Sequence, residues 1–359
     1  MSTFFRAIFS KVSEARTDPD LLYVGTYTEN IHLVRMDRRS GELVQVGVAN
    51  AGANPSFLAK HPNGHVLYAV NEIDAAGAVS AFAIEPGTGT LTRLNDQPSG
   101  GGAPCYVSVD KSGRAVLVAN YAGGSVALLP IEANGALAPA RVVQHTGKGP
   151  TPSRQEAPHA HCILPDPTNR FALAADLGAD RVFVYRLDLE GKALRQVGEA
   201  AMHPGAGPRH IAFHPTLPLV FVANELDSTV ATLRFDSTQG TLTLLDTRST
   251  LPADWTGTNY PADIHIAANG RTLYVSNRGH NSIAMFSVAD ATGALALAQV
   301  VSTEGDWPRN FSLDSTGRWL LVANQRSNSV IVFARDPETG KLTPTRQRIT
   351  IPSPVCLLR

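Results

Sequence analysis

Histidines, arginines and acidic residues stand at two recurring places in the chain, next to short apolar runs. One group comes directly after prolines that begin an apolar run, and its members are His159, His161, Arg209, His210, Asp263, His265 and Arg309. A second group comes where a later apolar run ends, and its members are Glu72, Tyr121, Asp176, Glu225, Arg278, His280 and Gln325. Imidazoles and carboxylates can transfer protons, and guanidiniums can stabilise negative charge. If the two groups converge, a water molecule or small anion held among them would meet all three kinds of side chain.

Each of these candidates also has a structural interpretation. Arg209 and Arg278 could form ion pairs between neighbouring structural units, although we favour a function for both. Glu225 has Glu72 at the equivalent place of another unit, so its position alone does not single it out. An asparagine recurs at the end of nearly every second apolar run. We interpret these asparagines as structural residues whose amides bind loop backbone groups, and they are Asn71, Asn120, Asn224, Asn277 and Asn324.

The sequence predicts neither a metal site nor a bound cofactor. His159 and His161 face the same side of a strand, but the sequence fixes no third ligand for a metal. The chain has no glycine-rich phosphate loop, dinucleotide motif or nucleophile elbow. Its cysteines lack the pattern of a nucleophilic site, and Cys162 is expected in the core. Three further histidines are expected in surface turns, namely His61, His203 and His214.

A repeated unit must position the candidates. Six stretches begin with a proline, continue as two apolar runs and recur at intervals of 47 to 54 residues, starting at Pro55, Pro104, Pro158, Pro208, Pro261 and Pro308. Two more apolar runs follow in each unit, and the turn before the last run contains Gly89, Gly135, Gly191, Gly240, Gly293 or Gly340. Such tight turns need a positive φ. The pattern predicts an all-β propeller with four antiparallel strands per blade.

The two ends of the chain predict how the ring closes. The first unit starts over residues 21–28 with a strand of the second type and lacks a proline-initiated strand. Residues 354–358 begin like a first strand, and then the chain stops. We therefore expect this C-terminal strand to join the N-terminal blade, giving a seven-bladed β-propeller over residues 21–359 without an open edge. Residues 1–20 form an extension with apolar residues at helical spacing, for which we expect a short amphipathic helix.

Both candidate groups belong to one face of this ring. The first strand of a blade runs away from that face and the second returns to it, so the two groups are neighbours. The first strands are innermost, and side chains from different blades should therefore converge on a central funnel. Two inserted loops, at residues 145–157 and 251–260, lie over the same face. Long loops on one face of a scaffold are often functional.

The composition excludes several other classes of protein. Basic and acidic residues balance at 31 each, so nothing indicates nucleic acid or an acidic membrane surface as a partner. No apolar run approaches the ~20 residues of a membrane-spanning helix. Three cysteines give no disulfide framework and fit a reducing compartment. We expect a cytoplasmic monomer whose partner is a small molecule.

Seven short motifs, in their order along the chain, resemble the seven-bladed propeller lactonase family. They are GTYT (25–28), PHAH (158–161), GPRH (207–210), NEL (224–226), ADIH (262–265), SNRGH (276–280) and PRNF (308–311). The resemblance covers about residues 21–359 and implies no required metal. It implies an active centre made of His159, Arg209, Glu225 and Arg278. Around this centre we expect substrate-binding residues at His161, His210, Asp263, His265, His280, Arg309 and Gln325.

By this resemblance, the expected activity is hydrolysis of a sugar lactone, first of all 6-phosphogluconolactone to 6-phosphogluconate in the pentose phosphate pathway. Glu225 or His159 would take a proton from water, and a neighbouring imidazole would act as the acid. Arg209 and Arg278 would hold the carbonyl oxygen, and Arg309 would bind a phosphate.

Replacing Glu225 by Gln is expected to slow turnover by ~10²–10⁴-fold and to leave stability nearly unchanged. Two alternatives to lactone hydrolysis stay open. One is an enzyme that forms or isomerises a lactone from an unsaturated diacid, as the fungal carboxy-muconate lactonizing members of the family do. The other is a non-catalytic propeller that binds a ligand or a protein.

Overall fold

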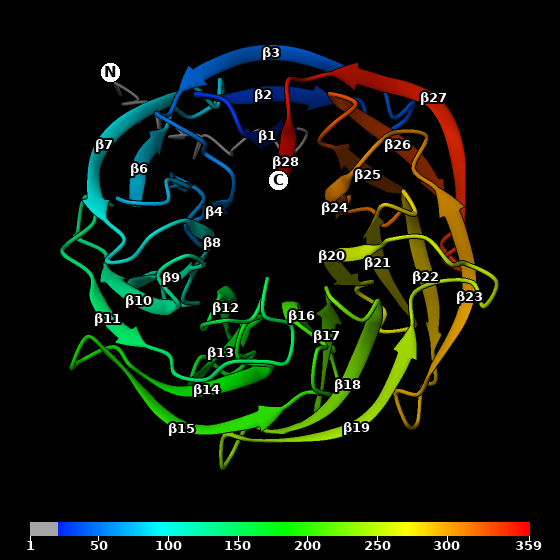
Figure 1. Ribbon diagram of the computed structural model, residues 1–359. Coiled ribbons are helices and arrows are strands. Elements are labelled where there is room, and N and C mark those ends of the chain that lie inside the picture. Colours follow the sequence, from blue (N-terminus) through cyan, green and yellow to red (C-terminus); the bar gives the residue numbers. More distant parts are fainter. Residues whose placement is uncertain (1–20) are drawn as a thin grey trace, which may run out of the picture.

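The computed structural model describes residues 21–359, which form a ring of seven four-stranded antiparallel sheets (Figure 1). The predicted all-β, seven-bladed β-propeller is therefore confirmed. Within residues 21–359, no helix is long and apolar enough to cross a membrane. The helix expected over residues 1–20 lies outside the described part of the chain.

Each blade uses four consecutive strands, except the blade that contains both ends of the described chain. From the inside of the ring outward, that blade contains β28 (Pro354–Leu358), β1 (Leu21–Thr26), β2 (Asn30–Met36) and β3 (Leu43–Asn50). The next three contain β4 (Leu58–Lys60), β5 (Val66–Asn71), β6 (Ala78–Ile84) and β7 (Leu91–Pro98); β8 (Pro104–Val109), β9 (Ala115–Asn120), β10 (Ser125–Pro130) and β11 (Arg141–Gln144); and β12 (Ala160–Pro165), β13 (Phe171–Asp176), β14 (Arg181–Asp188) and β15 (Ala193–Ala201). The last three contain β16 (Pro208–Phe213), β17 (Leu219–Asn224), β18 (Thr229–Asp236) and β19 (Thr241–Ser249); β20 (Tyr260–Ile266), β21 (Thr272–Arg278), β22 (Ser282–Val288) and β23 (Leu295–Ser302); and β24 (Pro308–Leu313), β25 (Trp319–Asn324), β26 (Ser329–Arg335) and β27 (Leu342–Thr350).

The C-terminal strand β28 closes the ring as predicted. It pairs antiparallel with β1, with Leu357 opposite Val24 and Cys356 opposite Gly25. In Figure 1, β28 lies on the inner side of β1, where every other blade has its proline-initiated strand. An unpaired inner edge of the first blade is thereby avoided.

The apolar core lies between neighbouring blades. All six residues of β17 are buried, because its two sets of alternating side chains both face another blade. Val220 and Val222 pack in one cluster with Phe171 of the preceding blade. Phe221 points the other way and packs in a cluster with Leu273 of the following blade. Each side chain buried in this way stabilises the fold by about 1.5–3 kcal/mol.

Tyrosine hydroxyls and turn glycines fasten these blades to one another. Tyr68 donates a hydrogen bond of 3.0 Å to the carbonyl oxygen of Gly135, and Tyr274 one of 2.6 Å to that of Gly340. Five of the six predicted turn glycines have a positive φ, as expected, namely Gly89, Gly135, Gly240, Gly293 and Gly340.

The prediction for Gly191 is wrong. In that turn the left-handed residue is Lys192, with a φ of 52°, while Gly191 is absent from the positive-φ residues. The backbone N–H of Gly191 donates instead to Oδ1 of Asp188 at 2.8 Å. This side-chain contact stabilises a different turn, in which the glycine does not occupy the left-handed position.

The recurring asparagines are structural, as predicted. Four of them donate side-chain hydrogen bonds to loop carbonyls, from Asn71 to Ala51 and Ala53, Asn120 to Ser99, Asn277 to Thr250, and Asn324 to Thr303. Asn224 differs, because its amide binds the hydroxyl of Thr229 at 2.9 Å. In the fourth unit Asp176 takes this place, and its buried carboxylate accepts from the backbone N–H of His159 at 2.7 Å.

The three histidines expected in surface turns have different environments. His203 is exposed, as predicted. His214 is buried, so the prediction for it is wrong. Its Nε2–H donates to the carbonyl oxygen of Gly270 at 3.1 Å, which ties the turn to the next blade. His61 is half-buried and bonds to the carbonyl oxygen of Gly113 at 2.9 Å in the same way.

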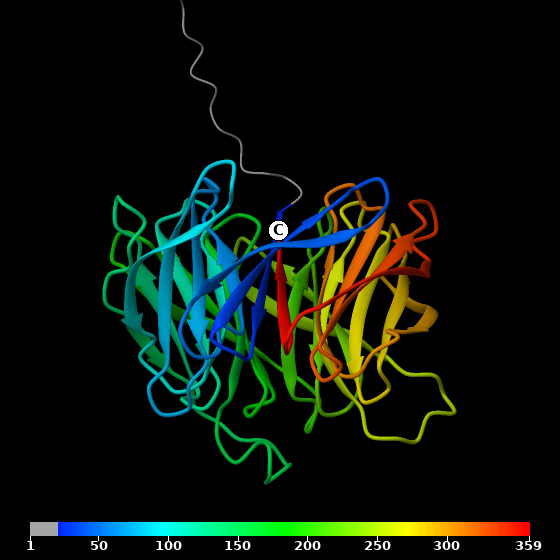
Figure 2. The same ribbon diagram turned by 90° about the horizontal axis from the view of Figure 1, so that it is seen from above.

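The inserted loops and the C-terminus lie on opposite faces of the ring. Both inserted loops, at residues 145–157 and 251–260, project from one face, at the bottom of Figure 2. The C-terminus lies at the opposite face. Glu225, which directly follows β17, is on the side of the inserted loops, because it contacts Arg154 of the first loop. This is the arrangement that the strand directions predict.

Candidate active site

Glu225 is the centre of a cluster of charged residues from two neighbouring blades and one inserted loop. It directly follows β17, and its side chain is buried. Nε of Arg209 lies 3.0 Å from Oε2 of Glu225, and Nη2 of Arg278 lies 2.6 Å from the same oxygen. Nη2 of Arg154 lies 2.5 Å from the other oxygen, Oε1. Three guanidiniums therefore surround one carboxylate.

The first two arginines are rigidly held. Arg209 extends from β16, and its Nη1 donates to the carbonyl oxygen of Ala262 at 2.5 Å. Arg278 ends β21, and its Nε donates to the carbonyl oxygen of Tyr260 at 3.1 Å. Both side chains are at most 5% exposed. Their positions do not depend on Glu225 alone.

Arg154 was not among the residues predicted for this site. It extends from the inserted loop at residues 145–157, and its side chain is 33% exposed. The sequence feature that indicated a contribution from this segment was the inserted loop itself, which was predicted to lie over this face. No repeat assigns a position to a residue inside an insertion, so the side chain that reaches Glu225 could not be identified.

The arginines decide the protonation of Glu225. Burial alone would raise the pKa of this carboxyl, but Arg278, Arg209 and Arg154 together hold it far below its ordinary value. Burial lowers the pKa of Arg278 to about 9 despite the attraction of Glu225. Glu225 is consequently ionised and a weak base at neutral pH, although the sequence allowed it as the general base.

His159 is better suited to remove a proton. Its Nδ1 lies 3.0 Å from the carbonyl oxygen of Tyr121, which can only accept, so Nδ1 carries the hydrogen in the neutral ring. Nε2 then has a free lone pair. Oε1 of Glu156 lies 3.2 Å from Nε2 and would accept a hydrogen bond once Nε2 is protonated. The ring stacks on that of Tyr121 at a centroid distance of 4.6 Å.

Next to Arg209, a buried polar network connects the inner strands β16, β20 and β24. Nε2 of His210 accepts from Arg209 at 3.1 Å, and its Nδ1–H donates to Oδ1 of Asp263 at 2.8 Å. Oδ2 of Asp263 accepts from His265 at 2.9 Å and from Asn310 at 2.5 Å. Burial lowers the pKa of His210 to about 4. This network supports Arg209 from below.

His161 belongs to the aromatic packing beside this network. Its ring meets the ring of His210 edge-on at a centroid distance of 5.4 Å, and its Nδ1 lies 3.6 Å from Sγ of Cys105. Burial and the nearby Arg209 hold its pKa well below the ordinary value. His161 is therefore a neutral ring at neutral pH and lies beneath the cluster around Glu225.

Arg309 belongs to a second, smaller cluster at the same face. Its guanidinium lies over the ring of Tyr27, 5.2 Å from the centroid. The hydroxyl of Tyr27 donates to Oε1 of Glu72 at 3.0 Å, and Ser56 donates to the same carboxylate. Arg309 thus has a carboxylate neighbour of its own, Glu72, although it is close enough to Arg209, Arg278 and Glu225 to interact with their charges.

The two remaining predicted residues lie outside both clusters. Nδ1 of His280 lies 2.8 Å from the hydroxyl of Ser282, and its ring meets Trp255 of the second inserted loop edge-on at 4.5 Å. Gln325 is half-buried, and within residues 21–359 its buried Oε1 has no hydrogen-bond partner. A role of these two in substrate binding stays a prediction.

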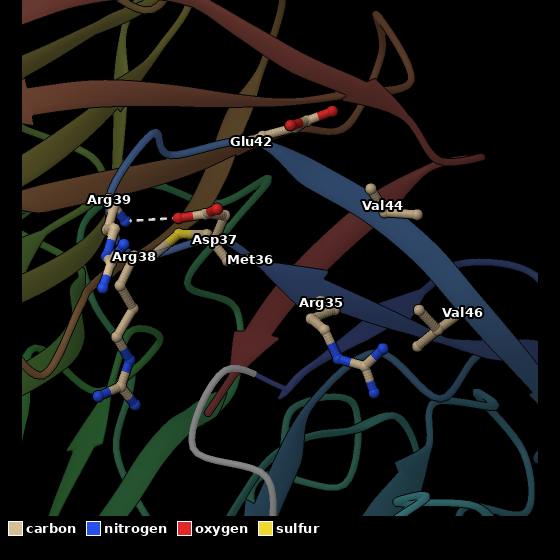
Figure 3. A pocket seen from close by; sticks show the side chains of 8 residues that line it. All are labelled: Arg35, Met36, Asp37, Arg38, Arg39, Glu42, Val44 and Val46. Atoms are coloured by element: carbon tan, nitrogen blue, oxygen red, sulfur yellow. Dashed lines mark hydrogen bonds between the residues drawn. The ribbon is translucent and has the colours of Figure 1, made fainter.

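No metal site accompanies the described charged residues around Glu225. In the described part of the chain, no group of three or more His, Cys, Asp or Glu side chains is placed to hold a metal ion. A groove of about 550 Å³ lies elsewhere, along β2 and β3 of the first blade (Figure 3). Its lining includes Arg35, Arg38, Arg39, Val44 and Val46.

Comparison with known proteins agrees with this fold over its whole length. The sequence model of a protein family described as a lactonase with a 7-bladed beta-propeller matches residues 21–359. A relative from Bacillus subtilis named 6-phosphogluconolactonase is 39% identical over 340 residues, which cover 93% of this chain and 97% of the relative. The solved structure of a periplasmic gluconolactonase from Pseudomonas aeruginosa is 35% identical, has a TM-score of 0.89 and covers 94% of this chain and 98% of its own. A solved protein from Lactobacillus plantarum is 37% identical with the same TM-score, over 94% of this chain and 98% of its own.

Proposed function

This chain belongs to the seven-bladed β-propeller lactonase family, and we propose that it hydrolyses 6-phosphogluconolactone to 6-phosphogluconate. The observation that carries the proposal is the cluster of Arg154, Arg209 and Arg278 around the single carboxylate of Glu225. Tyr121 links this cluster to His159, because its hydroxyl contacts Arg154 and its ring stacks on that of His159. Three positive charges face one negative charge. The net positive charge that results would attract an anionic substrate. The name of the Bacillus subtilis relative supports the same substrate.

The proposed reaction begins with a water molecule that loses a proton to Nε2 of His159. The oxygen of that water forms a bond to the lactone carbonyl carbon, and the carbonyl oxygen becomes an oxyanion. Arg209 and Arg278 offer fixed positive charge for this oxyanion. The carbon–oxygen bond of the ring then breaks, and protonated His159 gives its proton to the leaving ring oxygen. The product is an open-chain hydroxy acid.

In this mechanism Glu225 does not accept the proton. Its charge keeps two buried guanidiniums in place, with 2.6 Å between Oε2 and Nη2 of Arg278. Glu156 assists His159, because its carboxylate is within 3.2 Å of Nε2 and stabilises the imidazolium that forms.

The experiment is a hydrolysis assay with 6-phosphogluconolactone and with unphosphorylated gluconolactone, corrected for spontaneous ring opening. We expect hydrolysis by the unchanged protein, and a loss of ~10²–10⁴-fold in kcat for His159→Gln. His203→Gln is the matched control, because His203 is an exposed histidine of a surface turn. Absence of hydrolysis of both lactones by the unchanged protein would contradict the proposal.

A second candidate is the formation or isomerisation of a lactone from an unsaturated diacid. The excess positive charge around Glu225 would also suit a dicarboxylate. Unsaturated diacids assayed next to the sugar lactones decide between the two, because only the second candidate predicts their conversion.

Location and assembly stay predictions. The cysteines Cys105, Cys162 and Cys356 are all buried and unpaired, which supports a reducing compartment such as the cytoplasm. The Pseudomonas aeruginosa relative is described as periplasmic. Cell fractionation tests the location, and sedimentation of the purified protein tests whether it is a monomer.

A further inference from the structure

Arg154 differs from the other two arginines around Glu225. Arg209 and Arg278 each bind a backbone carbonyl in addition to the carboxylate. Arg154 binds Oε1 of Glu225 at 2.5 Å, and its other hydrogen bond is a long one of 3.5 Å to the hydroxyl of Tyr121. A guanidinium has five N–H donors. Most donors of Arg154 are therefore available to a ligand.

The loop that carries Arg154 is nevertheless well anchored. The neighbouring Gln155 is buried, and its Nε2 donates to the carbonyl oxygen of Leu177 at 2.9 Å and to Oδ1 of Asp180 at 2.7 Å. At the start of the loop, Nδ1 of His145 lies 2.6 Å from Oδ2 of the buried Asp176. These contacts fix the backbone on which Arg154 stands, so its side chain is presented from a defined position.

The charges at the site explain what Arg154 adds. Arg209 and Arg278 already place two buried positive charges on one oxygen of Glu225. A third, partly exposed guanidinium is not needed to neutralise this carboxylate. Because Arg154 extends from an inserted loop on the open face, it is the more accessible cation of the cluster.

We propose that Arg154 selects the substrate by binding the dianionic phosphate of a sugar-phosphate lactone with its planar guanidinium. A guanidinium can donate two parallel hydrogen bonds to a phosphate, which gives both strength and orientation. This inference rests on the proposed lactonase function and adds to it the residue that recognises the phosphorylated substrate.

Arg309, to which the sequence analysis assigned the phosphate, is less suited. Its guanidinium stacks over Tyr27, and the carboxylate of Glu72 is bound to the hydroxyl of the same tyrosine. The single carboxylate of this cluster, Glu72, favours the charged form of Arg309 without a direct ion pair, so the cluster has no net charge. The cluster around Glu225 has three arginines for one carboxylate and is therefore the positively charged one. This difference places phosphate recognition at the three-arginine cluster.

The test compares kcat/KM for 6-phosphogluconolactone and gluconolactone in Arg154→Gln, Arg154→Lys and Arg309→Ala. We expect Arg154→Gln to lower the ratio of the phosphorylated to the unphosphorylated value by about 10- to 100-fold, the effect of losing charge-assisted hydrogen bonds. Arg154→Lys should recover part of this loss, because it keeps the charge without the planar fork. Lys148→Gln is the control, since it removes an exposed positive charge from the same loop.

Two results would overturn the inference. One is an unchanged ratio in Arg154→Gln, including an equal fall for both lactones, which would mean that Arg154 acts through Glu225. The other is a fall in the ratio for Arg309→Ala alone.

If the unchanged protein hydrolyses neither lactone, the lactonase proposal fails. Calorimetric binding of 6-phosphogluconate against gluconate then tests Arg154 by itself: a preference for the phosphorylated ligand that disappears in Arg154→Gln supports it, and equal binding in both proteins refutes it.

Discussion

Replacing Glu225 by Gln should destabilise the protein, and the burial of its partners gives the size of the effect. The substitution keeps the shape of the side chain and removes its charge. Arg209 and Arg278 are at most 5% exposed, so water cannot take over the role of the carboxylate. In addition, an amide at position 225 would bring N–H donors close to guanidinium donors.

Removing one partner from a buried ion pair costs about 3–5 kcal/mol, since the other charge stays buried without compensation. Here the substitution leaves two such charges, held in place by carbonyl oxygens as well. Arg154 is partly exposed, and its pairing contributes no more than about 1 kcal/mol. We therefore expect a loss of about 3–5 kcal/mol in the free energy of unfolding. This replaces the sequence-based expectation that Glu225→Gln would leave stability nearly unchanged.

Equilibrium unfolding in urea at neutral pH and low ionic strength measures this loss. Glu156→Gln is the matched control, because Glu156 is 59% exposed and lies 3.2 Å from Nε2 of His159; we expect a change below about 1 kcal/mol for it. A free energy of unfolding for Glu225→Gln within about 1 kcal/mol of the unchanged protein would refute the reasoning. It would mean that the arginines are solvated or that another anion neutralises them.

Two further predictions concern the ring and its buried histidines. Deletion of residues 351–359 removes β28 from the sheet with β1, so the truncated protein should melt at a distinctly lower temperature in calorimetry; an equal melting temperature would contradict closure by this strand. His210 has a pKa of about 4 in the folded protein and an ordinary value of 6.5, so the unfolded chain binds the proton first as the pH falls. The free energy of unfolding should therefore decrease from pH 6.5 towards pH 4, and His210→Asn should show a shallower decrease in urea titrations at several pH values; an identical slope in both proteins would count against this origin.

The fold could be predicted because it depends on patterns that repeat along the sequence. Apolar runs separated by turns fix the strands. In five of the six units an asparagine follows the initiating proline by 16 residues, which fixes the length of those hairpins. The missing first strand at one end and the extra strand at the other require the ring to close. The strand directions then bring Arg209, Glu225 and Arg278 to one face, and the structure does bring these three into contact.

The details that could not be predicted depend on contacts outside the repeat. Arg154 reaches Glu225 only because Gln155 is anchored to Asp180, a contact between an insertion and a distant loop. His214 is buried because its ring meets a backbone carbonyl of the next blade. The position of Lys192 in a turn depends on a local hydrogen bond of Asp188. Such contacts cannot be predicted from the spacing of residues in the repeat.

The structure also shows why residue type alone could not divide the roles at this site. Glu225 and Glu156 are both glutamates of the candidate site, but arginines hold the first in its ionised form, while the second is largely exposed and lies 3.2 Å from Nε2 of His159. A carboxylate with so low a pKa gains little by accepting a proton from water. The base must therefore be a group whose lone pair no cation occupies, and Nε2 of His159 meets this condition. It follows that the two substitutions should differ in kind. Glu225→Gln should lose activity together with stability, whereas His159→Gln should lose activity with a smaller loss of stability, because it leaves no buried arginine without its carboxylate.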